Sequence, residues 1–170
     1  RQLINEVGID QENIYVGDPM KHLYKADLDL WTPEFPDVHY LDHDRTDAGR
    51  EIVQSGDSVI YYSDRGATLR TGSWSNMADG DPVYQDHVYK VFEDCEYLIN
   101  VPTLKGHRRA GITMFAKNHF GSHTRVDAKH LHMGLVCPDE PGRIPGNERH
   151  DYGMYRVQVD LMGWELIRDK

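Results

Sequence analysis

Cysteine is nearly absent from this 170-residue sequence, which contains only Cys95 and Cys137. The two residues are far apart and form no C-x-x-C pair, so the chain alone cannot ligate an iron–sulfur cluster or a Cys₄ zinc site. One disulfide and two reduced thiols both remain open, and two buried thiols are the commoner arrangement.

Long apolar runs and several catalytic signatures are also lacking. No stretch has the length of a signal peptide or a transmembrane helix, and we expect a cytoplasmic protein. No G-x-S-x-G elbow and no Cys/His signature occurs, which disfavours hydrolysis by a serine or cysteine nucleophile. Because the sequence begins with Arg and ends on a polar helix end, we expect a fragment whose C-terminal remainder is missing.

The composition indicates one soluble globular domain spanning residues 1–170. Apolar residues make up 39% and charged residues 28% of the chain, which is long enough to bury a hydrophobic core. The net charge of -9 argues against a general affinity for nucleic acid or for an anionic membrane.

One stretch lacks acidic residues altogether. Residues 97–126 contain no Asp or Glu, yet they hold five of the 19 Lys and Arg residues and three of the ten histidines. The rest of the chain has 14 basic residues against all 28 acidic ones. The positive charge is therefore local, and it indicates either a solvated basic surface or a site for an anion.

The pattern of apolar residues predicts an α/β fold with a mixed or mostly parallel sheet flanked by helices. Residues 1–9 have helical spacing with Gly8 as a stop, and 155–167 read as a closing helix. Strands are expected at 13–17, 38–44, 58–64 and 97–101, further helices at 87–95 and 110–120, and loops at 65–82 and 122–150.

The segment 97–121 thus reads as strand, loop and helix, which is where α/β domains keep their ligands. The glycines of Gly106-x₄-Gly111 resemble the start of a phosphate loop. Ile112 and Thr113 follow where Lys and Ser/Thr are needed, so nucleoside triphosphate binding is rejected. Backbone N–H groups at a helix start and nearby arginines favour a smaller anion.

Four histidines follow this segment with the spacing H-x₃-H-x₆-H-x-H. Imidazole is a common metal ligand, but the spacing matches no specific zinc pattern. A metal site and ordinary solvated histidines both remain open. The four are His119, His123, His130 and His132.

The stretch "YLINVPTLKGHRRAGITMFAKNHFG" resembles the pattern (I/L)NxPxLKTHxxxGVTxxxKNxFG of a widespread prokaryotic family known as domain of unknown function 362. "YVGDP", "LHMG" and "YRVQVDL" are similar to further landmarks of that family. One departure is Gly106, where the pattern has Thr. The resemblance implies an α/β fold and frequent association with iron–sulfur redox proteins. The matching residues are Asn100, Pro102, Leu104, Lys105, His107, Gly111, Thr113, Lys117, Asn118, Phe120 and Gly121.

A more distant resemblance is to the nickel-pincer lactate racemase family. His107, the Ala-Gly pair ending at Gly111, and Lys117 reproduce the spacing of that family's His, Ala-Gly and Lys. The resemblance implies that His107 is an acid/base residue and that Lys117 anchors a cofactor covalently. "DHDRT" (42–46), which contains His43, is similar to the family's Asp-His-x-x-Arg element with one residue fewer.

These observations predict an enzyme, or an enzyme lobe, that binds a small anionic organic substrate or cofactor at 97–121, with a racemase-like or oxidoreductase-associated activity. The cofactor is unknown, and a metal ion or a metal-containing organic cofactor is possible. The alternatives are a non-catalytic partner domain of an iron–sulfur protein and a histidine-based metal-binding protein. The expected catalytic residues are His107, Lys117 and His43. The expected cofactor-binding residues are Lys105, Gly106, Arg108, Arg109, Gly111, Thr113 and Asn118.

Overall fold

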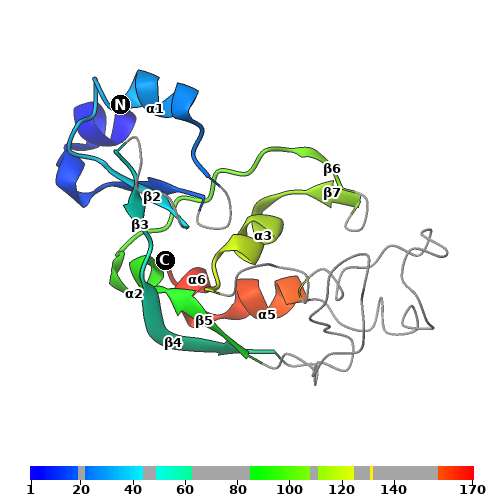
Figure 1. Cartoon of the computed structure of the whole chain (residues 1–170). Helices are drawn as coiled ribbons and strands as arrows, with labels where there is room; N and C mark the ends of the chain where they lie inside the picture. The colour runs from blue at the N-terminus through cyan, green and yellow to red at the C-terminus, as the bar shows by residue number, and fades with distance from the viewer. Residues whose placement is uncertain (19–21, 44–48, 63–84, 108–110, 125–130, 132–156) are drawn as a thin grey trace. The chain divides into compact units, whose positions relative to one another are not determined.

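The computed structural model describes residues 1–18, 22–43, 49–62, 85–107, 111–124, 131 and 157–170 (Figure 1). The chain divides into two compact units, Arg1–Gln54 and Ser55–Lys170. The chain contains both helices and strands, and the first unit contains a three-stranded parallel sheet, which confirms the predicted α/β class. A single domain spanning the whole chain stays a prediction.

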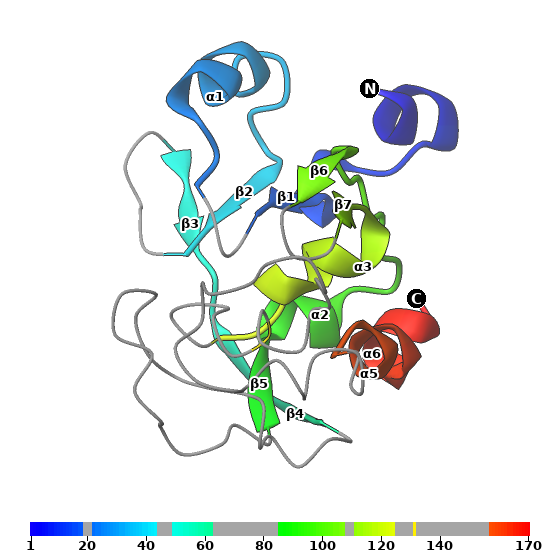
Figure 2. The same cartoon turned by 90° about the vertical axis from the view of Figure 1, so that its right-hand side faces the viewer.

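The first unit is built on a three-stranded sheet. Its strands are β1 (Tyr15–Gly17), β2 (His39–Asp42) and β3 (Glu51–Ile52), in that order, and both pairs are parallel. Parallel neighbours need a crossover connection, and helix α1 (Lys25–Trp31) lies within the connection from β1 to β2. Figure 2 shows α1 to one side of the three strands. The strands predicted around 13–17 and 38–44 are confirmed.

The N-terminal segment is helical, as its apolar spacing predicts. It forms a short π-helix, η1 (Leu3–Val7), and a 3₁₀ turn, η2 (Gln11–Asn13), follows it. Gly8 ends η1 with a φ of 83°, a left-handed conformation that glycine adopts without a steric penalty. The predicted stop at Gly8 is therefore confirmed.

The core of the first unit lies between α1 and β2. Leu28 of α1 is 1% exposed and packs with Val38 and Tyr40. The Tyr40 hydroxyl donates a hydrogen bond to the Phe35 carbonyl over 3.0 Å, and burial raises the pKa of this phenol. The partly buried residues around this cluster are Ile14, Val16, Leu23 and Phe35.

The second unit is built on an antiparallel hairpin of β4 (Ser55–Tyr61) and β5 (Gln85–Tyr89). Residues 122–124 lie along β5 as well, through an antiparallel bridge between Val88 and His123. Main-chain bonds from Tyr89 N to Ser122 O (3.2 Å) and from Thr124 N to His87 O (2.9 Å) flank the bridge. A late segment of the chain thus returns to β5.

Three helices pack around this hairpin. Helix α2 (Lys90–Asp94) leaves β5 directly, while α5 (Val157–Gly163) and α6 (Glu165–Arg168) form the helical end that the sequence predicts. The Lys170 ammonium donates to the carbonyls of Phe92, Glu93 and Cys95 at the end of α2, where the helix dipole favours a cation. The buried apolar side chains are Ile60, Tyr62, Val88, Tyr89, Phe92, Phe120, Leu131, Leu161 and Ile167.

Two buried phenols belong to the hairpin. The Tyr62 hydroxyl donates to Asp86 Oδ2 over 2.6 Å, which satisfies part of a carboxylate that is only 3% exposed. Burial raises the pKa of Tyr89 to about 12, so this side chain stays neutral at all physiological pH values.

Three sequence predictions in this unit need correction. The predicted helix 87–95 begins only at Lys90, because Asp86 and Val88 are buried while Gln85 and His87 are exposed, which is the alternation of a strand. The predicted strand 97–101 is not a strand. A strand needs a hydrogen-bonded neighbour, and no described segment pairs with these residues.

The third correction concerns 110–120. The strands β6 (Lys105–His107) and β7 (Gly111–Thr113) form an antiparallel hairpin, and the helix α3 (Phe115–Asn118) starts later than predicted. A 3₁₀ turn, η4 (His119–Gly121), continues from α3. The segment is therefore an extended stretch, a hairpin and a short helix, rather than a strand, a loop and a helix (Figure 1).

Candidate functional site

The strands of the β6–β7 hairpin contain five of the predicted site residues. In its register Lys105 pairs with Thr113, and His107 pairs with Gly111. Side chains two apart on a strand, and those of paired residues, share one face of a hairpin. Lys105, His107 and Thr113 therefore lie on one face of this hairpin.

This face contains a polar group that the described residues do not satisfy. Thr113 is 8% exposed, and its hydroxyl makes no hydrogen bond with any described residue. A buried hydroxyl without a partner costs about 1–3 kcal/mol. On the other face, a Cβ added to Gly106 would meet nothing within 4 Å. The backbone at Gly106 is thus open to an approaching molecule.

Lys117 on α3 lies over an aromatic ring. Its ammonium nitrogen is 4.4 Å from the centroid of Phe120, which is buried in the second unit. The negative face of an aromatic ring attracts a cation, and the contact is worth about 0.5–2 kcal/mol, more where it is desolvated. Phe120 therefore limits the positions that the half-buried Lys117 side chain adopts.

A side-chain network joins the extended stretch to α3 and η4. The Asn118 amide donates to Asn100 Oδ1 over 2.8 Å. The Asn100 amide in turn donates to the Phe115 carbonyl and to Nε2 of His119, each over 2.9 Å. Both the NH2 group and the carbonyl oxygen of the Asn100 side chain are therefore hydrogen-bonded. These bonds hold Asn100, and with it the stretch 97–104, against the helix.

The network also determines the protonation of His119. Since Nε2 accepts from Asn100, the ring proton lies on Nδ1, which is 3.1 Å from the Ser122 hydroxyl. His119 is 4% exposed and meets the Phe92 ring edge-on, with the centroids 6.5 Å apart. Burial lowers its pKa below the usual value for histidine, so the neutral ring is favoured.

The predicted metal site is only partly described. His119 uses both ring nitrogens, so a metal ion there would have to displace Asn100 or Ser122. His123 is buried at the bridge to Val88. His130 and His132 lie outside the described residues. Within the described ranges, no group of three or more His, Cys, Asp or Glu side chains could hold a metal ion.

The remaining predicted residues are more scattered. Arg108 and Arg109 lie outside the described residues, between the two strands of the hairpin. Asn118 lies in the network with Asn100 and His119. His43 belongs to the first unit, where it follows β2 and is half-buried. The structure does not describe a common site for His43 and His107.

Sequence reasoning missed the side chains that organise this segment. Asn100 matched the family pattern, but nothing in the pattern showed that it would bind Asn118 and His119. Phe120 also matched the pattern, but its contact with Lys117 was not predicted, and Ser122 was not expected at the site. The spacing Asn100 to Asn118 is a long-range relation, and a single sequence carries no signal for it.

The first unit contains a polar cluster that was also missed. Asp42 at the end of β2 has no exposed side-chain surface, and Arg50 Nε is 3.3 Å from its Oδ2. His22 Nδ1 is 2.6 Å from its Oδ1. The arginine also donates from Nε to the Leu23 carbonyl over 3.0 Å. The sequence analysis identified no partner of Asp42.

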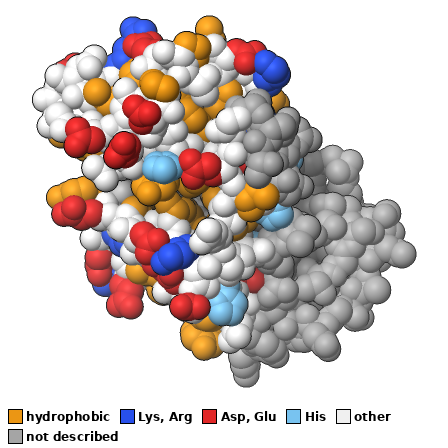
Figure 3. Space-filling model, turned by 60° about the vertical axis from the view of Figure 1, so that its left-hand side comes forward, with side chains coloured by type: hydrophobic (Ala, Val, Ile, Leu, Met, Phe, Trp, Pro, Cys, Tyr) orange, Lys and Arg blue, Asp and Glu red, His pale blue; other side chains and the backbone are white. Residues whose placement is uncertain are grey.

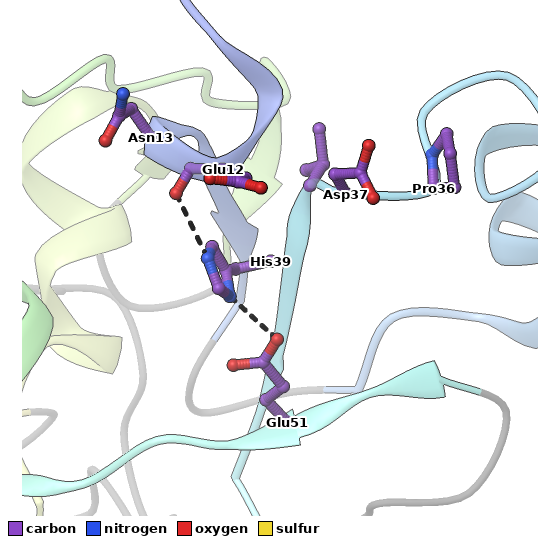
Figure 4. Close-up of a pocket in the computed structure, with 7 residues that line it drawn as sticks. Glu12, Asn13, Pro36, Asp37, His39 and Glu51 are labelled. Carbon is purple, nitrogen blue, oxygen red and sulfur yellow. Dashed lines mark hydrogen bonds and ion pairs between the residues drawn. The ribbon is translucent and has the colours of Figure 1, made fainter.

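An open hollow lies elsewhere on the first unit (Figure 4). At its centre His39 stacks on the Tyr15 ring, with centroids 4.5 Å apart. Its Nδ1 is 2.8 Å from Glu51 Oε1, and its Nε2 is 3.1 Å from the Glu12 carbonyl. Both ring nitrogens therefore lie within hydrogen-bond distance of an oxygen atom. The lining residues are Glu12, Asn13, Pro36, Asp37, Val38, His39 and Glu51.

The acidic character of the rest of the chain is visible on the described surface. In the view of Figure 3, acidic side chains are spread over the described part of this face, and hydrophobic side chains lie exposed among them. Against this background the segment 97–124, which has no acidic side chain, is distinct in charge. None of the described helices is long and apolar enough to cross a membrane.

The fold and the site together define an α/β protein with a basic hairpin and a network of amide side chains around the buried His119. The family model described as "Domain of unknown function (DUF362)" matches residues 62–153, more than half of the sequence, and the chain belongs to this family. The matched range contains all of 97–121, so the resemblance of that stretch is confirmed. No curated protein and no solved structure matches the chain. The likeness to lactate racemases stays a prediction.

Proposed function

We propose that this protein is an enzyme, or an enzyme lobe, that binds a small anionic organic molecule at the basic hairpin and helix within 97–121. The observation that carries the proposal is the shared face of Lys105, His107 and Thr113 in a segment without any acidic residue. Basic residues gathered in a segment that contains no acidic residue favour an anion, and the buried Thr113 hydroxyl, which bonds to no described residue, supplies a further polar contact.

Each residue has a defined role in the proposal. Lys105 attracts the anionic group, with Arg108 or Arg109 as its clamp. His107 exchanges a proton with the bound molecule as the acid/base residue. Lys117, held over Phe120, anchors the substrate or a cofactor through its amine.

The test compares Lys117→Ala with Lys90→Ala, an exposed lysine on α2 that pairs with Asp94. Inorganic phosphate and a 2-hydroxycarboxylate are titrated at low salt and followed by NMR. We expect saturable shifts in the wild type and in Lys90→Ala, and their loss in Lys117→Ala. Equal binding by the two variants, or no binding by the wild type, would overturn the proposal. Intact mass measurement of the natively produced protein then shows whether Lys117 bears a covalent group.

A second candidate function is favoured by one observation. Apolar side chains precede the basic hairpin and are strongly exposed, including Tyr97 at 73%, Val101 at 81% and Leu104 at 71%. Exposed apolar residues beside like charges are typical of protein-docking surfaces. The candidate is a non-catalytic domain whose basic surface docks the acidic surface of an iron–sulfur protein.

The two candidates differ in their response to salt and to substitution. Docking of a small acidic ferredoxin would weaken steeply as salt rises, because the interaction is between exposed charges. It would tolerate Lys117→Ala but not the reversal of Arg108 and Arg109 to Glu. Surface plasmon resonance at low and high salt measures both effects, and an Arg-reversed variant that binds normally would contradict docking.

A further inference from the structure

We infer that a bulge in β4 is a binding site for a carboxylate, and that the side chain of Glu93 occupies this site from within the chain. The bulge lies at residues 56–58, and Glu93 lies on α2. The inference does not rest on the function proposed at 97–121. It rests on the register of the strands, on one hydrogen bond and on the space beside Gly56.

The register of the β4–β5 hairpin shifts at this bulge. Ser55 pairs with Tyr89, and Val59 pairs with His87. Four steps along β4 thus correspond to two steps along β5. Extra residues in one strand interrupt the ladder of hydrogen bonds and are left unpaired. Backbone N–H groups at 56–58 are therefore available to an acceptor outside the sheet.

The Glu93 carboxylate is this acceptor. The Ser58 N–H donates a hydrogen bond to Glu93 Oε1 over 2.5 Å, and the carboxylate charge strengthens the bond. Hydrogen bonds from the backbone and the hydroxyl of Ser58 hold the pKa of Glu93 below its usual value, and the Asp57 backbone and the charge of Lys90 act in the same direction. The side chain is therefore an anion at neutral pH, held by N–H groups as a backbone nest holds a free anion.

Gly56 provides the space that the carboxylate fills. This glycine is buried, and a Cβ built on it would lie 2.5 Å from the carboxyl carbon of Glu93 and 2.5 and 2.7 Å from its two oxygens. Non-bonded heavy atoms do not approach so closely, so a side chain at position 56 and the carboxylate exclude each other. The site is thus formed by the bare backbone of Gly56 and the N–H group of Ser58.

The occupied site holds α2 beside the network around His119. Phe92, the neighbour of Glu93 on α2, is 8% exposed and meets the His119 ring edge-on. The Lys170 ammonium donates to the main-chain carbonyl of Glu93 over 3.0 Å, so the same residue is held through its backbone as well. Glu93 is therefore a positioning residue for Phe92 and, through it, for the His119 ring.

The class of ligand follows from these contacts. The substitution Glu93→Ala would remove the carboxylate but leave the N–H groups of the bulge and the space beside Gly56. A small monocarboxylate from solution can then take the vacated position, because it offers the same acceptor oxygens and the same charge. Formate is the smallest such molecule and is the probe of choice.

The test follows the Ser58 amide and the His119 ring by NMR in the wild type, in Glu93→Ala and in the control Glu96→Ala, at an exposed acid just after α2. We expect Glu93→Ala to shift both signals and to speed hydrogen exchange at the Ser58 amide several-fold. Sodium formate should reverse these changes saturably, and sodium chloride at the same ionic strength should not. The wild type and Glu96→Ala should not respond to formate.

Gly56→Ala separates binding in the bulge from a general effect of salt. This variant keeps Glu93 but fills the space, so we expect a Ser58 signal like that of Glu93→Ala and no response to formate. An unchanged Ser58 amide in Glu93→Ala, no formate response in that variant, or an equal response in Gly56→Ala would overturn the inference.

Glu93→Gln covers the case in which Glu93→Ala does not fold. The Gln oxygen can still accept from Ser58, but it does not titrate. The pKa of Glu93 lies below its usual value of 4.5, so the Ser58 amide of the wild type should shift with a midpoint below pH 4.5. The charged groups that face Glu93 are Lys90 and Asp57, and both are present in the two proteins. A shift of the same size in Glu93→Gln would refute the inference.

Discussion

The amide nitrogen of Asn100 is 2.9 Å from Nε2 of His119, and this contact joins two segments that are 19 residues apart. It makes one buried imidazole an acceptor at Nε2 and a donor at Nδ1. The family pattern contains Asn100, and the structure shows a physical reason for an amide there. An amide can donate twice and accept once, as this position requires.

The buried imidazole gives the protein a defined response to acid. The unfolded chain binds a proton at His119 near pH 6.5, whereas burial lowers the pKa of the folded form. The contribution of the neutral, buried His119 to the free energy of unfolding is therefore fully present above pH 6.5 and is lost as the pH falls below this value. We expect the free energy of unfolding to fall by at most about 1.4 kcal/mol per pH unit on this account.

The measurement is urea unfolding of the wild type and of His119→Gln from pH 7.5 to 5. The Gln carbonyl can still accept from Asn100 but does not titrate. The difference between the two proteins should shrink as the pH falls. Parallel pH curves for the two proteins would contradict the assignment of a neutral His119.

Asn100→Asp should destabilise the protein more at pH 7 than at pH 5. The carboxylate would place acceptors against the Phe115 carbonyl and against the lone pair of His119, at a cost of about 1–3 kcal/mol. A proton on His119 relieves one of these repulsions, so acid reduces the loss. Thermal unfolding at the two pH values measures the loss of stability. Asn5→Asp, at an exposed position, is the control. A loss independent of pH would refute this account of the network.

Two glycine-to-alanine substitutions should have opposite results. A Cβ at Gly17 would lie 2.8 Å from Leu41 Cβ and 3.1 Å from the Leu41 carbonyl, so β1 and β2 would have to separate, at about 1–3 kcal/mol. A Cβ at Gly106 meets nothing, and Gly106→Ala should leave the free energy of unfolding unchanged. Denaturant unfolding measures both, and equal losses would contradict the described backbones.

Gly106→Ala is also informative for binding. If an anion approaches the backbone of β6, the added methyl group should weaken its binding while the fold is retained. The NMR titration with phosphate detects this, and Gly106→Thr, which restores the residue of the family pattern, tests whether a hydroxyl is accepted there. Unaltered affinity in Gly106→Ala would show that the ligand does not approach this backbone.

Helix α1 offers a matched pair of leucines. Leu28 is 1% exposed and Leu30 is 73% exposed, although both lie in the same seven-residue helix. Leu28→Ala should cost about 2–5 kcal/mol because it leaves a cavity in the core. Leu30→Ala should change stability by less than about 0.5 kcal/mol. Chemical denaturation distinguishes them, and similar losses would show that α1 packs differently.

The sequence predicted those elements whose pattern is local. The stop at Gly8, the strands β1 and β2, and the closing helices α5 and α6 follow from apolar spacing and from glycine's freedom at positive φ. The strand predicted at 97–101 is wrong because strand-forming residues specify a strand only where another strand pairs with them. At 110–120, the apolar spacing of a helix overlapped with the alternation of β7.

The candidate site stays a prediction. The missing acidic residues indicated its charge and its position in the chain, and the family pattern matched the same stretch. The partners of His119, and the pairing of His22 with Asp42, depend on contacts between distant segments. Composition and periodicity hold no information about such contacts.

The bridge between Val88 and His123 has a consequence for how this segment can vary. The chain leaves β5 through α2 and comes back to β5 at 122–124, so everything between is a closed excursion anchored at both ends. The backbone pairs that set the register of β4 against β5 lie outside this excursion, so its exposed residues can vary without changing that register.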